Sequence, residues 1–296
     1  MLNPSRSTRT LAVLFTCAAL AACGGGDDTA DAGADDTGAD AQPQVIADAG
    51  SITGSIDFTG TPPTPEPIDM SAEPDCAAKH DGTPTQRAVV VNSGKLANVF
   101  VRISQGVQGG GGAPSGSAEV DQDGCVYAPH VVGVQTGQEV EFRNSDGLLH
   151  NIKASPANNR PFNISQPTTM TSRQTFNSPE VMVPVVCDVH GWMNMFIGVV
   201  DHPYFDTSGE DGSFTIANVA PGTYTVETWH EVYGVQSQQV TVEPNSTAEL
   251  TFAYDAGMAA TAVVPLGDPI DPHGTHASLG ARLSHPAPHA TAAGSR

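Results

Sequence analysis

Short segments that alternate apolar and polar residues, bounded by Gly and Pro, constrain the fold of this chain most. They include "SITGSIDFTG", "LANVFVRIS" and "GSFTIANVAPGTYTVETWHE". A period of two residues is typical of strands with one buried face. Between residues 49 and 254 we find no long, capped segment with the helical period of 3.6 residues. The sequence therefore predicts an all-β protein built as β-sandwiches.

The N-terminal residues differ from this region. Arg6 and Arg9 precede the apolar run "LAVLFTCAALAA", which is too short to span a bilayer and predicts a signal peptide at residues 1–22. The run ends in "LAAC", which resembles the lipobox of bacterial lipoproteins and implies that Cys23 is lipidated. Gly24 follows the cysteine, so we expect a lipid anchor in the outer membrane that faces the periplasm. An ordinary signal peptide with a chance cysteine is the alternative.

Two segments are expected to be disordered. Residues 23–48 are rich in Asp and poor in large apolar groups, which predicts a flexible acidic linker. Residues 255–296 predict a disordered tail that contains several histidines. These histidines either scavenge metal ions or are simply solvated: His273, His276, His285 and His289.

The formal net charge of −20 limits the class of partner. Nucleic-acid binding depends on Lys and Arg that neutralise phosphates, so this acidic balance argues against a nucleic-acid partner. A basic protein partner would suit the charge, although general solubility explains it equally well.

Cysteine usage points to one disulfide. With Cys23 assigned to lipid and Cys17 to the signal peptide, three cysteines remain outside the cytoplasm, where two are expected to pair. Cys187 has histidine and methionine neighbours, so the expected disulfide joins Cys76 and Cys125.

Two weaker clusters stay open. A zinc or copper site is the alternative to the disulfide, with four candidate ligands: Cys76, His80, Cys125 and His130. His230 and Glu231 in "WHE" either contribute to a surface site or docking face, or form an ordinary cluster at the end of a strand.

The stretch "VVCDVHGWMNMF" carries the strongest chemical pattern. Cys187, His190 and Met193 follow one another at intervals of three, and "VEFRNSDGLLHN" supplies His150 at the end of another expected strand. Two histidines and one cysteine, with a weak axial methionine, are the ligands of a type 1 copper centre. The alternative is a buried cysteine that packs with Trp192 and the methionines as core.

Residues 120–203 resemble a cupredoxin, a Greek-key β-sandwich, with the ligand spacing of the amicyanin branch. The resemblance implies one copper ion bound by His150, Cys187 and His190, with Met193 as axial ligand. Met195 lies at the plastocyanin spacing and is the rival axial ligand. We favour Met193 because the residues after it run directly into the strand "FIGVV".

The resemblance also assigns roles around the ligands. Asn151 matches the family's asparagine that ties the two ligand loops together. Gly191 stands where similar loops have proline, which would loosen the loop. Pro184 removes a ladder donor before Cys187, so its strand is expected to be at an edge or bulged there.

A second resemblance concerns the flanking residues. "DGSFTIANVAPGTYTV" is similar to the second half of a carboxypeptidase regulatory-like domain, a small transthyretin-like sandwich, whose first half would lie near "GSITGSIDFTGTPP". We therefore expect this smaller sandwich at residues 49–117 and 206–254, interrupted by a cupredoxin domain at 118–205.

The function expected from these features is one-electron transfer to redox partner proteins, not catalysis, because a saturated site leaves no position for substrate. The ring edge of His190 would be the electron exit, in a surface patch with Trp192 and Met195. A copper storage, delivery or sensing protein is one alternative. A structural or adhesive surface module with a degenerate metal site is another.

Overall fold

The computed structural model describes residues 46–108, 114 and 116–258. The expected signal peptide, the lipidated Cys23, most of the linker and nearly all of the histidine-containing tail therefore lie outside the described residues. Within the described residues, no helix has the length and apolarity needed to cross a membrane.

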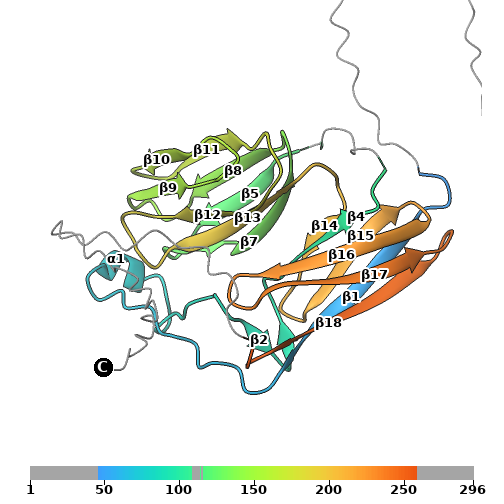
Figure 1. Ribbon diagram of the computed structural model, residues 1–296. Coiled ribbons are helices and arrows are strands. Elements are labelled where there is room, and N and C mark those ends of the chain that lie inside the picture. Colours follow the sequence, from blue (N-terminus) through green and yellow to red (C-terminus); the bar gives the residue numbers. More distant parts are fainter. Residues whose placement is uncertain (1–45, 109–113, 115, 259–296) are drawn as a thin grey trace, which may run out of the picture. The chain divides into compact units, whose positions relative to one another are not determined.

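The described chain is nearly all β, as the alternation predicts (Figure 1). A short helix, α1 (Pro74–Ala77), interrupts the early strands. The strands up to the middle of the chain are β1 (Gly50–Thr59), β2 (Val91–Asn92), β3 (Lys95–Leu96), β4 (Phe100–Gln105), β5 (Ala118–Gln122), β6 (Tyr127–Ala128), β7 (Val131–Gln135), β8 (Glu139–Asn144) and β9 (His150–Ala154). The remaining strands are β10 (Phe162–Gln166), β11 (Met170–Thr175), β12 (Glu180–Val186), β13 (Asn194–Val200), β14 (Phe205–Thr207), β15 (Ser213–Val219), β16 (Gly222–His230), β17 (Gly234–Val242) and β18 (Thr247–Asp255).

Strands from both ends of the described chain form one sandwich, here called the outer sandwich. One sheet has the order β15-β1-β3-β2, with β18 parallel to β1, and the other has the order β14-β4-β16-β17. Apolar residues of these strands form one core cluster, which includes Ile52, Ile56, Val226 and Phe252 at 0% exposure. The alternation seen in the sequence thus places one face of each strand in this core.

Strands β5 to β13 form a second sandwich, here called the inner sandwich. Its sheets have the orders β10-β9-β12-β13-β7 and β11-β8-β5-β6. All of its strands lie between β4 and β14 in the chain, so the inner sandwich is inserted into the outer one. Phe142, Ile152 and Val183 are fully buried in its core.

Residues 66–86 lie within the stretch 49–117 that the sequence assigns to the smaller sandwich, but they do not all pack there. They precede β2 of the outer sandwich, yet Ile68, Met70 and Cys76 belong to the core cluster of the inner sandwich. The segment that holds α1 therefore contributes to the sandwich that carries the ligand loops. We call residues 66–86 the α1 segment.

The proline in β12 lies where the ladder permits it. Pro184 pairs with Phe196 of β13, and the ladder to β9 on the other side begins only at Val185. The register of β12 against β13 also shifts between Glu180 and Val183. The expectation of an edge strand is wrong, because β12 lies between β9 and β13, whereas the register shift just before Pro184 fits the expected bulge.

Candidate metal centre

Two loops bring the candidate ligands together. His150 opens β9, and Cys187 follows the end of β12, which pairs with β9 through Val185 and Val186. This antiparallel pairing sets the two loops side by side, and the backbone N–H of Asn151 lies 3.5 Å from the Sγ of Cys187 as its donor. The ladder, rather than any single loop, therefore fixes the spacing of the site.

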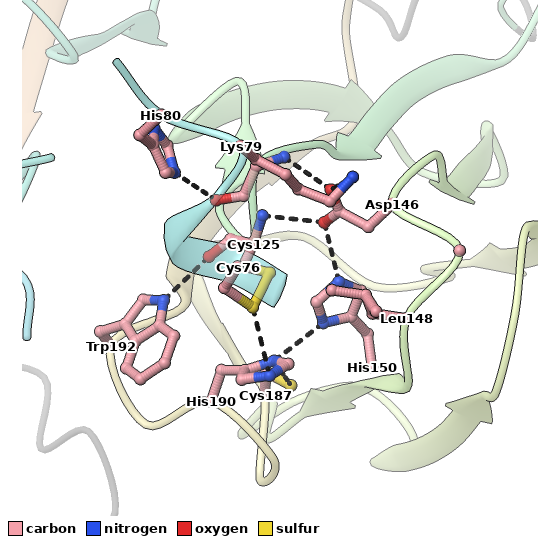
Figure 2. Close-up of a disulfide and its surroundings, with 12 residues drawn as sticks. Cys76, Lys79, His80, Cys125, Asp146, Leu148, His150, Cys187, His190 and Trp192 are labelled. Carbon is pink, nitrogen blue, oxygen red and sulfur yellow. Dashed lines mark hydrogen bonds and ion pairs between the residues drawn. A yellow bond between two sulfur atoms is a disulfide. The ribbon is translucent and has the colours of Figure 1, made fainter. Parts of the chain in front are cut away.

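The three donor atoms converge in the interior (Figure 2). The Nδ1 atoms of His150 and His190 are 2.9 Å apart, and the Sγ of Cys187 lies 3.9 Å from the Nδ1 of His190. One ligand atom from each of these residues lies within 4.8 Å of the others. All three residues are buried, with exposures of 0%, 2% and 3% for His150, Cys187 and His190.

The donor set fits a soft or borderline transition metal. Burial raises the pKa of the Cys187 thiol, but hydrogen bonds to His150 and His190 outweigh it and lower the pKa to about 6. The thiolate is the form that ligates metals, so the folded chain prepares this ligand at neutral pH. One thiolate and two imidazoles suit copper, and they do not match the oxygen ligands of magnesium or calcium.

The two methionines occupy different places. Met193 lies in the ligand loop, where its backbone carbonyl accepts a hydrogen bond from the N–H of Cys187 and its N–H donates to the carbonyl of His190. Met195 lies within β13, opposite Val185. Met193 therefore closes the loop that carries both ligands, whereas Met195 is a strand residue with 0% exposure.

Asn151 links the two ligand loops. Its Oδ1 accepts a hydrogen bond of 2.6 Å from the backbone N–H of Asp188, next to Cys187. Its Nδ2 donates to the Oδ1 of Asn163 at 2.6 Å, and the hydroxyl of Tyr127 donates to its carbonyl at 2.7 Å. These bonds hold the two loops in a single relative position, which is the role that the resemblance implies for Asn151.

The ring edge of His190 is covered, contrary to the expected surface exit. A disulfide joins Cys76 and Cys125, and the Sγ of Cys76 lies 3.6 Å from the Nε2 of His190 (Figure 2). The α1 segment thereby covers the side of the imidazole that faces away from Cys187. The sequence did not reveal this because the contact spans a separation of 114 residues.

The two residues expected in an apolar surface patch, Trp192 and Met195, are not both exposed. Met195 is fully buried, and Trp192 is partly buried. The indole N–H of Trp192 donates to the carbonyl of Cys125 at 2.9 Å, and its ring centroid is 5.1 Å from that of His190. Trp192 therefore packs between the ligand histidine and the disulfide loop.

The weaker clusters do not form sites of their own. The Nε2 of His80 lies 2.8 Å from the carbonyl oxygen of Gly124, and His130 pairs with Glu231. His230 has 0% exposure and its Nδ1 accepts a hydrogen bond from the N–H of Val232, so it is not a surface ligand. Burial lowers the pKa of His230 to about 3.

The sequence reasoning missed two charged residues at the site. Asp146 contacts His150 from the loop after β8, and Lys79 of the α1 segment pairs with Asp146. Burial raises the pKa of the Asp146 carboxyl, but hydrogen bonds from His150, Cys125, Lys79 and Gly124 outweigh it and lower the pKa to about 2. The only sequence cue was an acid four residues before a candidate ligand, which is a weak one.

Comparisons with known proteins give distant likenesses. The family described as "Polysaccharide lyase family 4, domain II" matches residues 173–250, less than half of the chain. Curated proteins give no match.

Solved structures give partial matches. They include a Cu-containing nitrite reductase (NirK) from Thermus scotoductus SA-01, with 22% identity and a TM-score of 0.27 over 32% of this chain and 24% of the reductase. A purple cupredoxin from Nitrosopumilus maritimus has 20% identity and a TM-score of 0.25, over 28% of this chain and 99% of its own. An oxidized amicyanin mutant has 17% identity and a TM-score of 0.26, over 33% and 97%. These likenesses are too distant to assign a function.

Proposed function

We propose that this protein is a lipid-anchored, type 1 copper protein that carries single electrons in the bacterial periplasm or at the outer membrane. One observation supports the proposal above all. The Nδ1 atoms of His150 and His190 and the Sγ of Cys187 converge inside the inner sandwich, from two loops that the β9–β12 ladder holds together.

His150, Cys187 and His190 would hold the ion, with Met193 as axial ligand and Met195 as its rival. Copper would supply the Cu(II)/Cu(I) redox couple, whose two oxidation states differ by one electron. The chain contributes a site whose donors are already in place, because the ladder, the Asn151 bridge and the loop bonds of Met193 fix them. A site that does not rearrange keeps the cost of each electron transfer low.

The same buried residues exclude water from the ligands. A closed set of ligands also leaves no position for a substrate, so we propose electron transfer without catalysis. The redox partner is another protein, whose route to the site includes Trp192 and the Cys76–Cys125 disulfide, since these groups contact His190. The lipid on Cys23 would keep the protein at the membrane.

The test is a visible spectrum of the full chain, purified in detergent and loaded with Cu(II). We expect an intense thiolate-to-copper band that disappears on reduction and returns on reoxidation, with one copper per chain. Cys187→Ser should abolish the band, whereas Cys76→Ser with Cys125→Ser should keep it. A chain that binds copper without any strong visible band would contradict the proposal.

One observation favours the alternative of copper storage or delivery. The ligands are nearly inaccessible, and the disulfide covers the ring edge of His190. Such burial suits retention of Cu(I) as well as electron transfer. A colourless complex that binds Cu(I) tightly but does not cycle reversibly would favour this alternative.

A further inference from the structure

Asp146 is a buried carboxylate with a partner on every side. Its side chain has 0% exposure. Its Oδ2 lies 2.8 Å from the Nε2 of His150 and accepts a hydrogen bond of 2.8 Å from the backbone N–H of Cys125. Its Oδ1 accepts the N–H of Gly124 at 2.7 Å and pairs with the Nζ of Lys79 at 3.0 Å (Figure 2).

The loop that carries Asp146 is itself fixed. The Oδ1 of Asn144, a residue with 0% exposure, accepts hydrogen bonds from the backbone N–H groups of Asp146 and Gly147. The Nδ2 of Asn144 donates to the carbonyl of Leu148 at 2.7 Å. These bonds therefore fix the position of the Asp146 carboxylate independently of its contact with His150.

The contact with Asp146 determines what the two ring nitrogens of His150 can do. A carboxylate only accepts, so the nitrogen that faces it, Nε2, carries the proton of this hydrogen bond. The other nitrogen, Nδ1, points toward the Nδ1 of His190 and the thiol of Cys187. Once Nδ1 has lost its proton, an imidazole that stays protonated at Nε2 presents its lone pair at Nδ1, where the other donors converge.

We propose that Asp146 is a positioning residue for His150: it fixes the tautomer and orientation of this ligand and makes it a stronger donor. This inference deepens the proposed copper function and rests on it for the effect on the metal. The buried negative charge is tolerated because Lys79 and two backbone N–H groups compensate it.

The support for Asp146 comes from residues far apart in the sequence. Lys79 belongs to the α1 segment, and Gly124 and Cys125 belong to the loop that the disulfide joins to that segment. The covalent link therefore keeps both sets of partners at the carboxylate. The α1 segment therefore contacts His190 directly and supports His150 through Asp146.

The test compares three variants of the full chain. Asp146→Ala removes the carboxylate, Asp146→Asn keeps an oxygen that can accept the proton of His150, and Glu119→Gln removes an exposed acid paired with Arg143. Cu(I) affinity is measured by competition with a chromophoric chelator. We expect Asp146→Ala to bind Cu(I) about 10–100-fold more weakly, Asp146→Asn to lose less, and Glu119→Gln to match the unmodified chain.

A second readout needs no metal. NMR of the metal-free chain should show a His150 Nε2–H proton that exchanges slowly with water, present in Glu119→Gln and lost in Asp146→Ala. If the unmodified chain failed to bind Cu(I), the proposed function would fail while this readout still tested Asp146. A folded Asp146→Ala variant with unchanged Cu(I) affinity, or with the protected proton retained, would overturn the inference.

Discussion

At the scale of single residues, the site consists of charged groups whose ionisation is coupled. Asp146 and His150 form a buried pair at 2.8 Å, and His150 also contacts Cys187. Burial lowers the pKa of His150, but its hydrogen bonds to Asp146 and Cys187 outweigh it and raise the pKa to about 9. In the metal-free chain the pair is therefore ionic over a wide range of pH.

This coupling predicts how stability depends on pH. Because the pKa of Asp146 falls from 3.8 to about 2, its contribution is complete above pH 3.8 and is lost as the pH falls through 2. Because the pKa of His150 rises from 6.5 to about 9, its contribution is complete below pH 6.5 and is lost as the pH rises through 9. The destabilisation caused by Asp146→Asn should thus be largest between pH 3.8 and 6.5.

Urea unfolding of the metal-free chain and of Asp146→Asn, at a series of pH values, measures this difference. Glu119→Gln is the control, because its ion pair is exposed and should contribute little at any pH. A difference between the unmodified chain and Asp146→Asn that stays constant from pH 3 to 9 would contradict the coupling.

The sequence predicts the candidate ligands, but not the residues that surround them in the structure. Cys187, His190 and Met193 are close in the chain, so their spacing is visible, and the structure brings His150 to Cys187 and His190. Asp146 and Lys79 approach from separate loops that the sequence does not connect. Burial of His190 was also unpredictable, since the covering disulfide comes from a segment with weak local pattern.

At the scale of elements, strands were predictable and the α1 segment was not. Alternating residues such as those of β1 and β15 report their buried face directly. Residues 66–86 form only a short helix and an isolated bridge, so their position depends on long-range contacts. The disulfide between Cys76 and Cys125 is the strongest of these contacts.

Removing this disulfide should have two effects. The bond closes a loop with a sequence separation of 49, so Cys76→Ser with Cys125→Ser should lower the free energy of unfolding by up to about 4 kcal/mol. The freed α1 segment should also expose the Nε2 edge of His190. In the copper-loaded chain, a small-molecule reductant should then reduce the site faster.

Chemical unfolding and stopped-flow reduction measure these two effects separately. Asn92→Ala is a suitable control for the kinetic measurement, because Asn92 is exposed on the short strand β2 of the outer sandwich. Unchanged reduction kinetics in a folded double variant would show that the disulfide does not limit access to His190.

At the scale of the whole described chain, the two sandwiches share a core cluster. Phe100 of β4 and Trp229 of β16 pack with Phe196 and Val200 of β13, and the rings of Phe196 and Trp229 are 5.0 Å apart. Together with the α1 segment, this cluster makes the inner sandwich dependent on residues outside 118–205. Residues 118–205 alone therefore lack Ile68 and Cys76 of the core of the inner sandwich and Lys79, the partner of Asp146.

The shared cluster predicts that the sandwiches unfold together. A Cβ added at Gly198 would lie 2.6 Å from the Cζ of Phe100 and 2.9 Å from the Sδ of Met182, so Gly198→Ala should force the two sandwiches apart locally. Overpacking of this kind costs about 1–3 kcal/mol.

Gly191→Ala is the matched control, because its added Cβ would meet no atom within 4 Å. Calorimetry of the metal-free chain should show one transition whose midpoint falls in Gly198→Ala and is kept or raised in Gly191→Ala. Two resolved transitions in the unmodified chain, with only one shifted by Gly198→Ala, would mean that the cluster does not couple the sandwiches.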